Sequence, residues 1–129
     1  MPIGSGLGSS AASSVGGAVA VNALMGAPLS ALDVVSCALR GEAAASGTVH
    51  ADNVAPSVLG GIVLIRSSDP LDLIPLPIPA ALQIVIVHPH TEVLTAEARR
   101  LVAEHRFTIG QAVTNMGNIA ALVTALFRE

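Results

Sequence analysis

The chain opens with Met1-Pro-Ile-Gly-Ser-Gly-Leu-Gly-Ser-Ser-Ala-Ala12, in which three glycines alternate with small residues. Glycine permits backbone conformations that a Cβ would forbid, and successive N–H groups of such a loop can point at one anion. Ser9 and Ser10 then begin a run rich in Ala and Val, and serine is a good residue for opening a helix. Because a helix N-terminus presents unbonded N–H groups and partial positive charge, this stretch predicts a phosphate-binding loop.

Other glycine-rich sites fit this stretch less well. A P-loop needs a lysine, and the chain contains none. The dinucleotide pattern G-x-G-x-x-G/A fits residues 6–11, but it requires a preceding strand and an acidic residue about 20 positions on, whereas Asp33 lies too far along. A G-x-S-x-G nucleophile elbow is also absent from the sequence. On residue types alone, two structural interpretations remain as alternatives to an anion site: a flexible N-terminal tail, or a turn that lets two helices pack closely.

Composition excludes several classes of function. The 129 residues suit one domain, and because 52% are hydrophobic but only 2% aromatic, the core must consist of Ala, Val, Leu and Ile. A net charge of −3 without lysine argues against a nucleic-acid surface, and the single Cys37 excludes an internal disulfide. No apolar stretch reaches the length of about 20 residues that spans a bilayer, and no basic signal peptide opens the chain. We therefore expect a cytoplasmic protein without nucleic-acid or membrane partners.

Two helices are predicted after the loop. The first runs from Ser10 to about Met25, is apolar nearly all round and is therefore expected to be buried on most sides. Gly26 ends it, and Ser30 caps a second helix from residue 31 to about 45, with Asp33 in its first turn. The residues expected to supply much of the second helix's apolar surface are Leu32, Val35, Cys37, Leu39 and Ala43.

Two polar features of the middle of the chain have two readings each. Glu42 lies near a helix end, where it opposes the dipole; it is either a solvated side chain or an Mg²⁺ ligand. Ser46-Gly-Thr-Val-His-Ala-Asp-Asn-Val-Ala-Pro56 breaks the helical periodicity and concentrates polar groups. Since Asp and Asn favour turns, this segment is either a link between a helix and a strand or part of a binding site.

Strands and further helices are expected in the second half. Residues 59–66 predict a strand after a glycine turn, 67–70 a turn, and 71–79 a short edge strand. Ala80–His88, apolar and β-branched, predicts a central buried strand, and His88 with His90 is read as a loop pair without a metal role. Thr95 opens a helix, and a last helical stretch spans 107–128. Its apolar stripe, read as packing, comprises Val113, Met116, Ala120, Val123 and Phe127.

The opening stretch resembles the motif P-x-x-x-G-L-G-S-S-A-A of the GHMP kinases, without gaps. The resemblance implies that ATP is bound there and that Ser10 and Glu42 share Mg²⁺, Glu42 thereby serving catalysis. The residues implied to bind the nucleotide are Pro2, Ile3, Gly4, Ser5, Gly6, Leu7, Gly8, Ser9, Ser10, Ala11 and Ala12.

Residues 47–56 resemble the segment G-x-x-H-x-D-N-V-A-P of the homoserine kinase branch. This implies that Asp52 binds the amino group of L-homoserine, that Asn53 lies near its hydroxyl as a catalytic residue, and that His50 lines the pocket. An amide has no proton-accepting state at neutral pH, so the transfer would depend on positioning and charge neutralisation. Residues 94–99 resemble S-T-x-E-A-R with Leu in place of Ser; Arg99, otherwise a surface charge, would then bind the substrate carboxylate beside Thr95.

The resemblance covers essentially the whole chain but only the middle of the family's sequence. It implies an α+β fold, with residues 1–78 as part of a ribosomal-protein-S5-like N-terminal domain and 79–129 as the start of a ferredoxin-like domain. The implied reaction is phosphorylation of L-homoserine by ATP in threonine biosynthesis, with little or no activity from these residues alone. A kinase of the mevalonate or galactose type and a non-catalytic nucleotide-binding remnant stay open as alternatives, and so does a homodimer.

Overall fold

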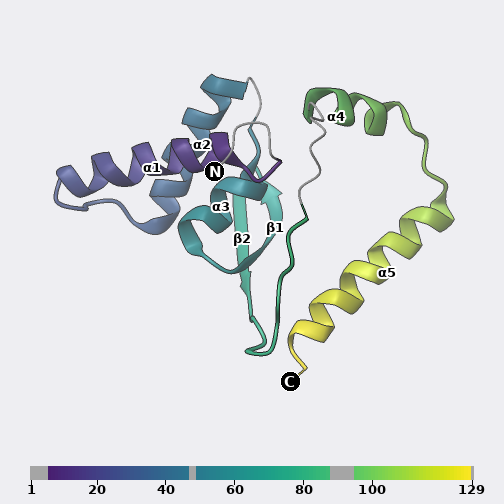
Figure 1. Cartoon of the computed structure of the whole chain (residues 1–129). Helices are drawn as coiled ribbons and strands as arrows, with labels where there is room; N and C mark the ends of the chain where they lie inside the picture. Colours follow the sequence, from purple (N-terminus) through teal and green to yellow (C-terminus); the bar gives the residue numbers. More distant parts are fainter. Residues whose placement is uncertain (1–5, 47–48, 88–94, 129) are drawn as a thin grey trace. The chain divides into compact units, whose positions relative to one another are not determined.

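The computed structural model describes residues 6–46, 49–87 and 95–128 of the chain. They divide into two compact units, Met1–Leu76 and Pro77–Glu129, each of which is described by itself (Figure 1). The mixture of helices with an antiparallel strand pair confirms the α+β class. In chain order the elements are α1 (Ser9–Leu24), α2 (Ala31–Ser46), α3 (Ala51–Leu59), β1 (Ile62–Ser68), β2 (Leu71–Leu76), α4 (Thr95–Glu104) and α5 (Ile109–Leu126).

Helix α1 begins and ends at glycines. Gly8, with φ of 74°, is its N-cap, and Gly26, with φ of 84°, follows its last turn. The N–H of Gly26 donates to the carbonyl of Ala23 at 3.0 Å, and that of Ala27 to the carbonyl of Asn22 at 2.7 Å. This pair of bonds is a Schellman motif, which needs a residue that tolerates positive φ at Gly26. The predicted span of the helix is confirmed to within one residue at each end.

The expectation that α1 is buried on most sides is wrong. Its buried residues are Ala11 and Val15, on the side that packs against α2 and α3. Val19 and Val21 are 47% and 56% exposed. Within the described residues of the first unit, α2 and α3 are the helices that contact α1, and they cover one side of it. Hydrophobicity all round a helix predicts burial only when other elements surround it.

Helix α2 is capped as the sequence predicts. The Oγ of Ser30 accepts from the N–H of Asp33 at 3.2 Å, while the Asp33 carboxylate accepts from the N–H of Ser30 at 3.0 Å and from its hydroxyl at 2.6 Å. The expected apolar face is partly wrong, because Leu32 is 55% exposed and Cys37 is also exposed. The buried apolar face has steps of one, three and four residues and consists of Val34, Val35, Ala38 and Leu39.

Residues 51–59 form helix α3, where the sequence predicted only a polar link or a binding segment. Ala51, Val54 and Ala55 are 3%, 0% and 0% exposed, and they recur at a helical spacing that the polar residues between them obscured. Pro56 lies inside the helix and has no N–H to donate to the preceding turn. Burial of one apolar face therefore outweighs an unfavourable proline, and the helix ends at Gly60.

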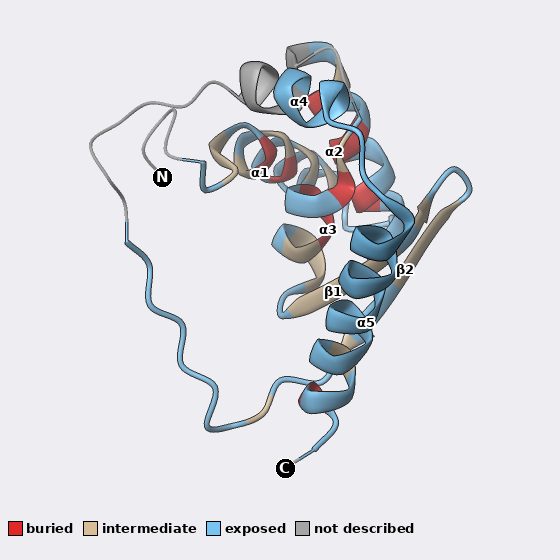
Figure 2. Cartoon of the chain, turned by 90° about the vertical axis from the view of Figure 1, so that its right-hand side faces the viewer, coloured by how far each residue is buried: buried red, intermediate tan, exposed pale blue. Residues whose placement is uncertain are grey.

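The core of the first unit lies where α1, α2 and α3 meet (Figure 2). Side chains from α3 and from both strands pack against its edge, among them Val58, Val63 and Leu73. The core consists of Ala, Val and Leu side chains, as the near-absence of aromatic residues predicts. Its buried members are Ala11, Val15, Val35, Ala38, Leu39, Ala51, Val54 and Ala55.

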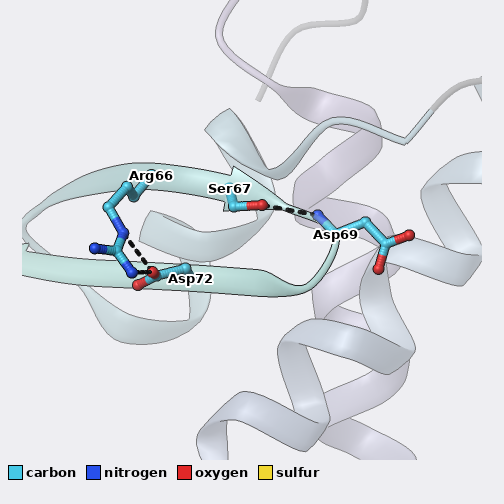
Figure 3. Close-up of polar contacts among 4 residues, drawn as sticks. All are labelled: Arg66, Ser67, Asp69 and Asp72. Carbon is cyan, nitrogen blue, oxygen red and sulfur yellow. Dashed lines mark hydrogen bonds and ion pairs between the residues drawn. The ribbon is translucent and has the colours of Figure 1, made fainter.

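Strands β1 and β2 form an antiparallel pair. Ile62 lies opposite Leu76 and Ser68 opposite Leu71, with an irregularity between Ile65 and Ser67. Arg66, at that irregularity, makes an ion pair with Asp72 across the hairpin, and Ser67 accepts a hydrogen bond from the N–H of Asp69 at 3.3 Å (Figure 3). The two strands predicted on either side of a turn are observed. The first begins at residue 62 and includes residues 67 and 68, which were assigned to the turn, and the second ends at Leu76 rather than at residue 79.

A central buried strand was predicted over residues 80–88. The structure describes residues 80–87 of this segment, and they do not form a strand. Ile84, Val85 and Val87 are 77%, 86% and 84% exposed and lie outside any strand. The one sheet among the described residues consists of β1 and β2, which pair with each other. A strand exists only where a neighbouring strand takes its backbone hydrogen bonds. β-branched composition indicates that a segment suits a sheet but does not supply the partner.

The second unit contains α4 and α5. Helix α5 begins with a capping box: the Oγ1 of Thr108 accepts from the N–H of Gln111 at 3.2 Å, and the Gln111 side chain accepts from the N–H of Thr108 at 2.9 Å. The packing expected of its apolar stripe is not observed within the described residues, because Val113, Met116 and Phe127 are 58%, 63% and 66% exposed.

Candidate functional site

The glycine-rich loop leads directly into the first turn of α1. Gly6 and Gly8 have φ of 72° and 74°, so both use the left-handed conformation that favours glycine. Gly8 is the N-cap and has no side chain to bond the first-turn N–H groups, while its carbonyl accepts from Ala12 at 3.0 Å. The N–H groups of the first turn therefore lack an intrahelical acceptor and are oriented for an external anion. Residues 2–5 of the predicted nucleotide site lie outside the described residues.

A hydroxyl and a carboxylate meet at this helix start. The Oγ of Ser10 donates to the Oε1 of Glu42 at 2.8 Å, although the two residues are 32 positions apart in the chain. Glu42 is only 7% exposed, which excludes the reading of a solvated surface glutamate. A buried carboxylate is tolerated where it has hydrogen-bond donors or a cation beside it, and the positive end of a helix contributes in the same direction.

Close packing of α1 and α2 makes this contact reachable. A Cβ on Gly41 would lie 3.4 Å from the Oγ of Ser14, so the helices approach closely one residue before Glu42. Because Ser14 and Gly41 are both small, the two helices can approach this closely. The side chain of Glu42, the residue after Gly41, then lies beside the N-terminus of α1. The sequence analysis missed this role of Gly41. The signal available was a glycine inside a predicted helix, next to the candidate ligand.

The start of α3 contributes the second group of polar side chains. His50 is its N-cap and is half-buried, while Asp52 and Asn53 lie exposed in the first turn. Asn53 contacts the loop: a Cβ on Gly8 would lie 2.8 Å from its Oδ1. The structure therefore brings Asn53 next to the loop that carries Ser10. Neither the helical form of this segment nor its contact with Gly8 was expected from sequence.

Two predicted site residues lie in the other unit. Thr95 and Arg99 fall within α4, whose first residue is Thr95. Their side chains are not among the described ones, so their approach to the first unit remains a prediction. His88 and His90, read as a loop pair, lie outside the described residues.

The donor set at the α1 N-terminus fits a hard cation bound together with phosphate. A carboxylate oxygen and a hydroxyl oxygen are the ligand types that Mg²⁺ takes, and Mg²⁺ commonly keeps waters and substrate phosphates as its other ligands. In the part of the chain that the structure describes, no three His, Cys, Asp or Glu side chains gather into a metal site.

Comparison with known proteins gives concordant matches. Residues 1–61 match the family model described as GHMP kinases N terminal domain. The homoserine kinase of Chloroherpeton thalassium is 44% identical over 128 residues, which are 99% of this chain and 40% of that protein. The homoserine kinase of Methanococcus maripaludis strain C5 is 42% identical over 98% of this chain and 41% of its own length.

A solved structure is also similar. The crystal structure of homoserine kinase from Cytophaga hutchinsonii aligns with a TM-score of 0.86 and 46% sequence identity, over 96% of this chain and 39% of that one. The chain thus spans about two fifths of the length of the relatives that it matches.

Proposed function

We propose that this chain, which is similar to the GHMP kinase N-terminal domain over residues 1–61 and to a segment of the homoserine kinases, forms the nucleotide-binding part of a homoserine kinase. The reaction is transfer of the γ-phosphoryl group of ATP to the hydroxyl of L-homoserine, which gives O-phosphohomoserine and ADP for threonine biosynthesis. Related proteins named homoserine kinase in both bacteria and archaea support this proposal. A cytoplasmic location and a homodimer remain predictions.

The hydrogen bond between Ser10 and Glu42 at the start of α1 is the observation that carries the proposal. The loop and the first-turn N–H groups bind the phosphate oxygens of ATP, and the small loop residues allow the phosphates to approach the backbone. Ser10 and Glu42 together would hold Mg²⁺, which would supply positive charge to offset that of the ATP phosphates. Because the Ser10 proton is donated to Glu42, the lone pairs of its Oγ remain available to a cation.

The acceptor side of the site is formed by the start of α3. Asn53 lies against the phosphate loop and orients the homoserine hydroxyl toward the γ-phosphate, while Asp52 binds the amino group and His50 lines the pocket. Thr95 and Arg99 bind the substrate carboxylate. An amide orients but cannot remove a proton, which suits a loose transition state in which positioning matters more than a base.

Binding of an ATP analogue with Mg²⁺, measured by calorimetry on wild type and Glu42→Ala, tests the proposal. We expect the substitution to weaken binding by about tenfold or more, since an interaction with a charged group contributes roughly 1.5–3 kcal/mol. The difference should shrink when Mg²⁺ is omitted, because Glu42 acts through the metal. Glu104→Ala is the matched control: Glu104 is an exposed glutamate that pairs with Arg100 in α4.

Three results would contradict the proposal in different ways. Equal affinities for wild type and Glu42→Ala would remove the metal role of Glu42. An equal loss in Glu104→Ala would show that the effect is not specific to the site. Nucleotide binding without any response to L-homoserine, in a chain extended to the length of its relatives, would favour a nucleotide-binding protein without this acceptor.

A further inference from the structure

Two glycines of the loop have the same backbone conformation but different surroundings. Gly6 and Gly8 have φ of 72° and 74°, a region that side-chain-bearing residues rarely adopt. A Cβ on Gly6 would have no heavy atom of the described residues within 4 Å, its chain neighbours aside. A Cβ on Gly8 would lie 2.8 Å from Oδ1, 2.9 Å from Cγ and 3.0 Å from Cβ of Asn53. Gly8 is therefore constrained twice, by its conformation and by its neighbour.

A rotation of the Asn53 side chain would not relieve the contact fully. Its Oδ1 and Cγ can rotate away, but its Cβ is fixed by the backbone of α3 and would still be 3.0 Å distant. Helix α3 is held in the core by Val54 and Ala55, both 0% exposed. A shift of α3 would disturb close-packed side chains, so the position of Asn53 limits where the loop can lie.

We propose that Gly8 is a positioning residue that couples the phosphate loop to Asn53, so that ordering of the loop by a nucleotide phosphate fixes the Asn53 side chain for the acceptor hydroxyl. The role of Asn53 toward the acceptor rests on the proposed function, whereas its contact with Gly8 does not. Coupling of this kind is reciprocal: an acceptor that orders Asn53 also favours the bound form of the loop, and nucleotide affinity rises when the acceptor is present.

Gly8→Ala and Gly6→Ala form a matched pair for the contact itself. Both introduce a Cβ at positive φ, but only the first places it against Asn53. In the ligand-free chain, NMR resonances of the Asn53 side-chain amide and of the α3 first-turn amides should move in Gly8→Ala and remain in place in Gly6→Ala. Equal shifts in the two variants, or none in Gly8→Ala, would overturn the proposal.

A double-mutant cycle separates the contact between a Cβ at position 8 and Asn53 from the backbone strain of placing a Cβ at positive φ. Asn53→Ala removes the two closest atoms, so Gly8→Ala should lower the melting temperature less in the Asn53→Ala background than in wild type. The effect of Gly6→Ala should be the same in both backgrounds, because its Cβ would not lie within 4 Å of Asn53. Additive effects of Gly8→Ala and Asn53→Ala would contradict the coupling.

A binding experiment tests the functional half in a chain extended to the length of its relatives. The Kd of an ATP analogue with Mg²⁺ should fall when L-homoserine is saturating, and this ratio should approach one in Asn53→Ala. A ratio of one in wild type would overturn the coupling of the two substrates. Absence of any L-homoserine binding would instead contradict the proposed function, with the NMR comparison still deciding whether Gly8 positions Asn53.

Discussion

At the scale of single residues, Glu42 shows what a sequence can and cannot establish. Its position in the chain is compatible with a surface glutamate or a metal ligand, and the family motif favours the ligand. Burial to 7% exposure and the 2.8 Å bond from Ser10 exclude the surface reading. The burial of Glu42 depends on how closely α2 packs on α1 at Gly41. The distance between two helices cannot be predicted from the residues around Glu42 in the sequence.

Asp33 makes stability depend on pH. The hydrogen bond from the Ser30 hydroxyl, aided by the Ser30 N–H, holds the pKa of Asp33 below its ordinary value of 3.8. A depressed folded-state pKa contributes stability above the unfolded-state pKa, and this contribution is lost as the pH falls through the folded-state value. We expect Asp33→Asn to lower the melting temperature at pH 7, and to lower it progressively less as the pH falls below the ordinary Asp pKa of 3.8. If the melting temperatures of wild type and Asp33→Asn differed by the same amount at low pH, the effect would not come from the charge of Asp33.

At the scale of elements, the sequence predicts best those helix ends that depend on interactions between residues close together in the chain. The ends of α1 and α2 were predicted well, because caps such as Gly26 and Ser30 act through bonds between near neighbours in the chain. Helix α3 was not predicted, because polar residues and a proline interrupt the segment and obscure the helical spacing of its apolar residues, which include Val54 and Ala55. The strand expected over 80–88 required a partner that no local pattern specifies.

Gly16 inside α1 and Gly26 just after its C-terminus should respond in opposite ways to substitution by alanine. Gly26→Ala places a Cβ at φ of 84° and should cost about 1 kcal/mol or more of unfolding free energy. Gly16→Ala, inside the helix with open space around its Cβ, should stabilise by about 0.5–1 kcal/mol. Urea denaturation followed by circular dichroism measures both. Stabilisation by Gly26→Ala would contradict the Schellman assignment, and destabilisation by Gly16→Ala would contradict the expectation for the helix interior.

At the scale of the whole molecule, several apolar surfaces are open to solvent. Helix α5 contains no charged residue between Ile109 and Leu126, and most of its side chains are exposed. No helix in the described ranges is both long and apolar enough to cross a membrane. Large exposed apolar patches usually mark surfaces that other protein segments cover. The relatives contain further sequence beyond the matched two fifths of their length.

Self-association of the 129-residue chain through α5 is the expected result of this exposure. Sedimentation velocity at increasing concentration should show oligomers for wild type. The double substitution Val113→Glu and Met116→Lys, at side chains 58% and 63% exposed, should reduce them. Thr114→Glu with Asn118→Lys adds the same charges at polar positions of the helix and should change association less. Monomeric wild type at every concentration would refute this expectation.

The pairing of Ser10 with Glu42 has a thermodynamic consequence for folding. Because the two side chains come from different helices, the site exists only when α1 and α2 are docked, and a ligand that bridges it binds the folded chain alone. At a concentration 100 times its Kd such a ligand adds about 2.7 kcal/mol to stability. If magnesium nucleotide is that ligand, as proposed, its free concentration relative to its Kd would shift the folded fraction of the chain and so its exposure to proteases.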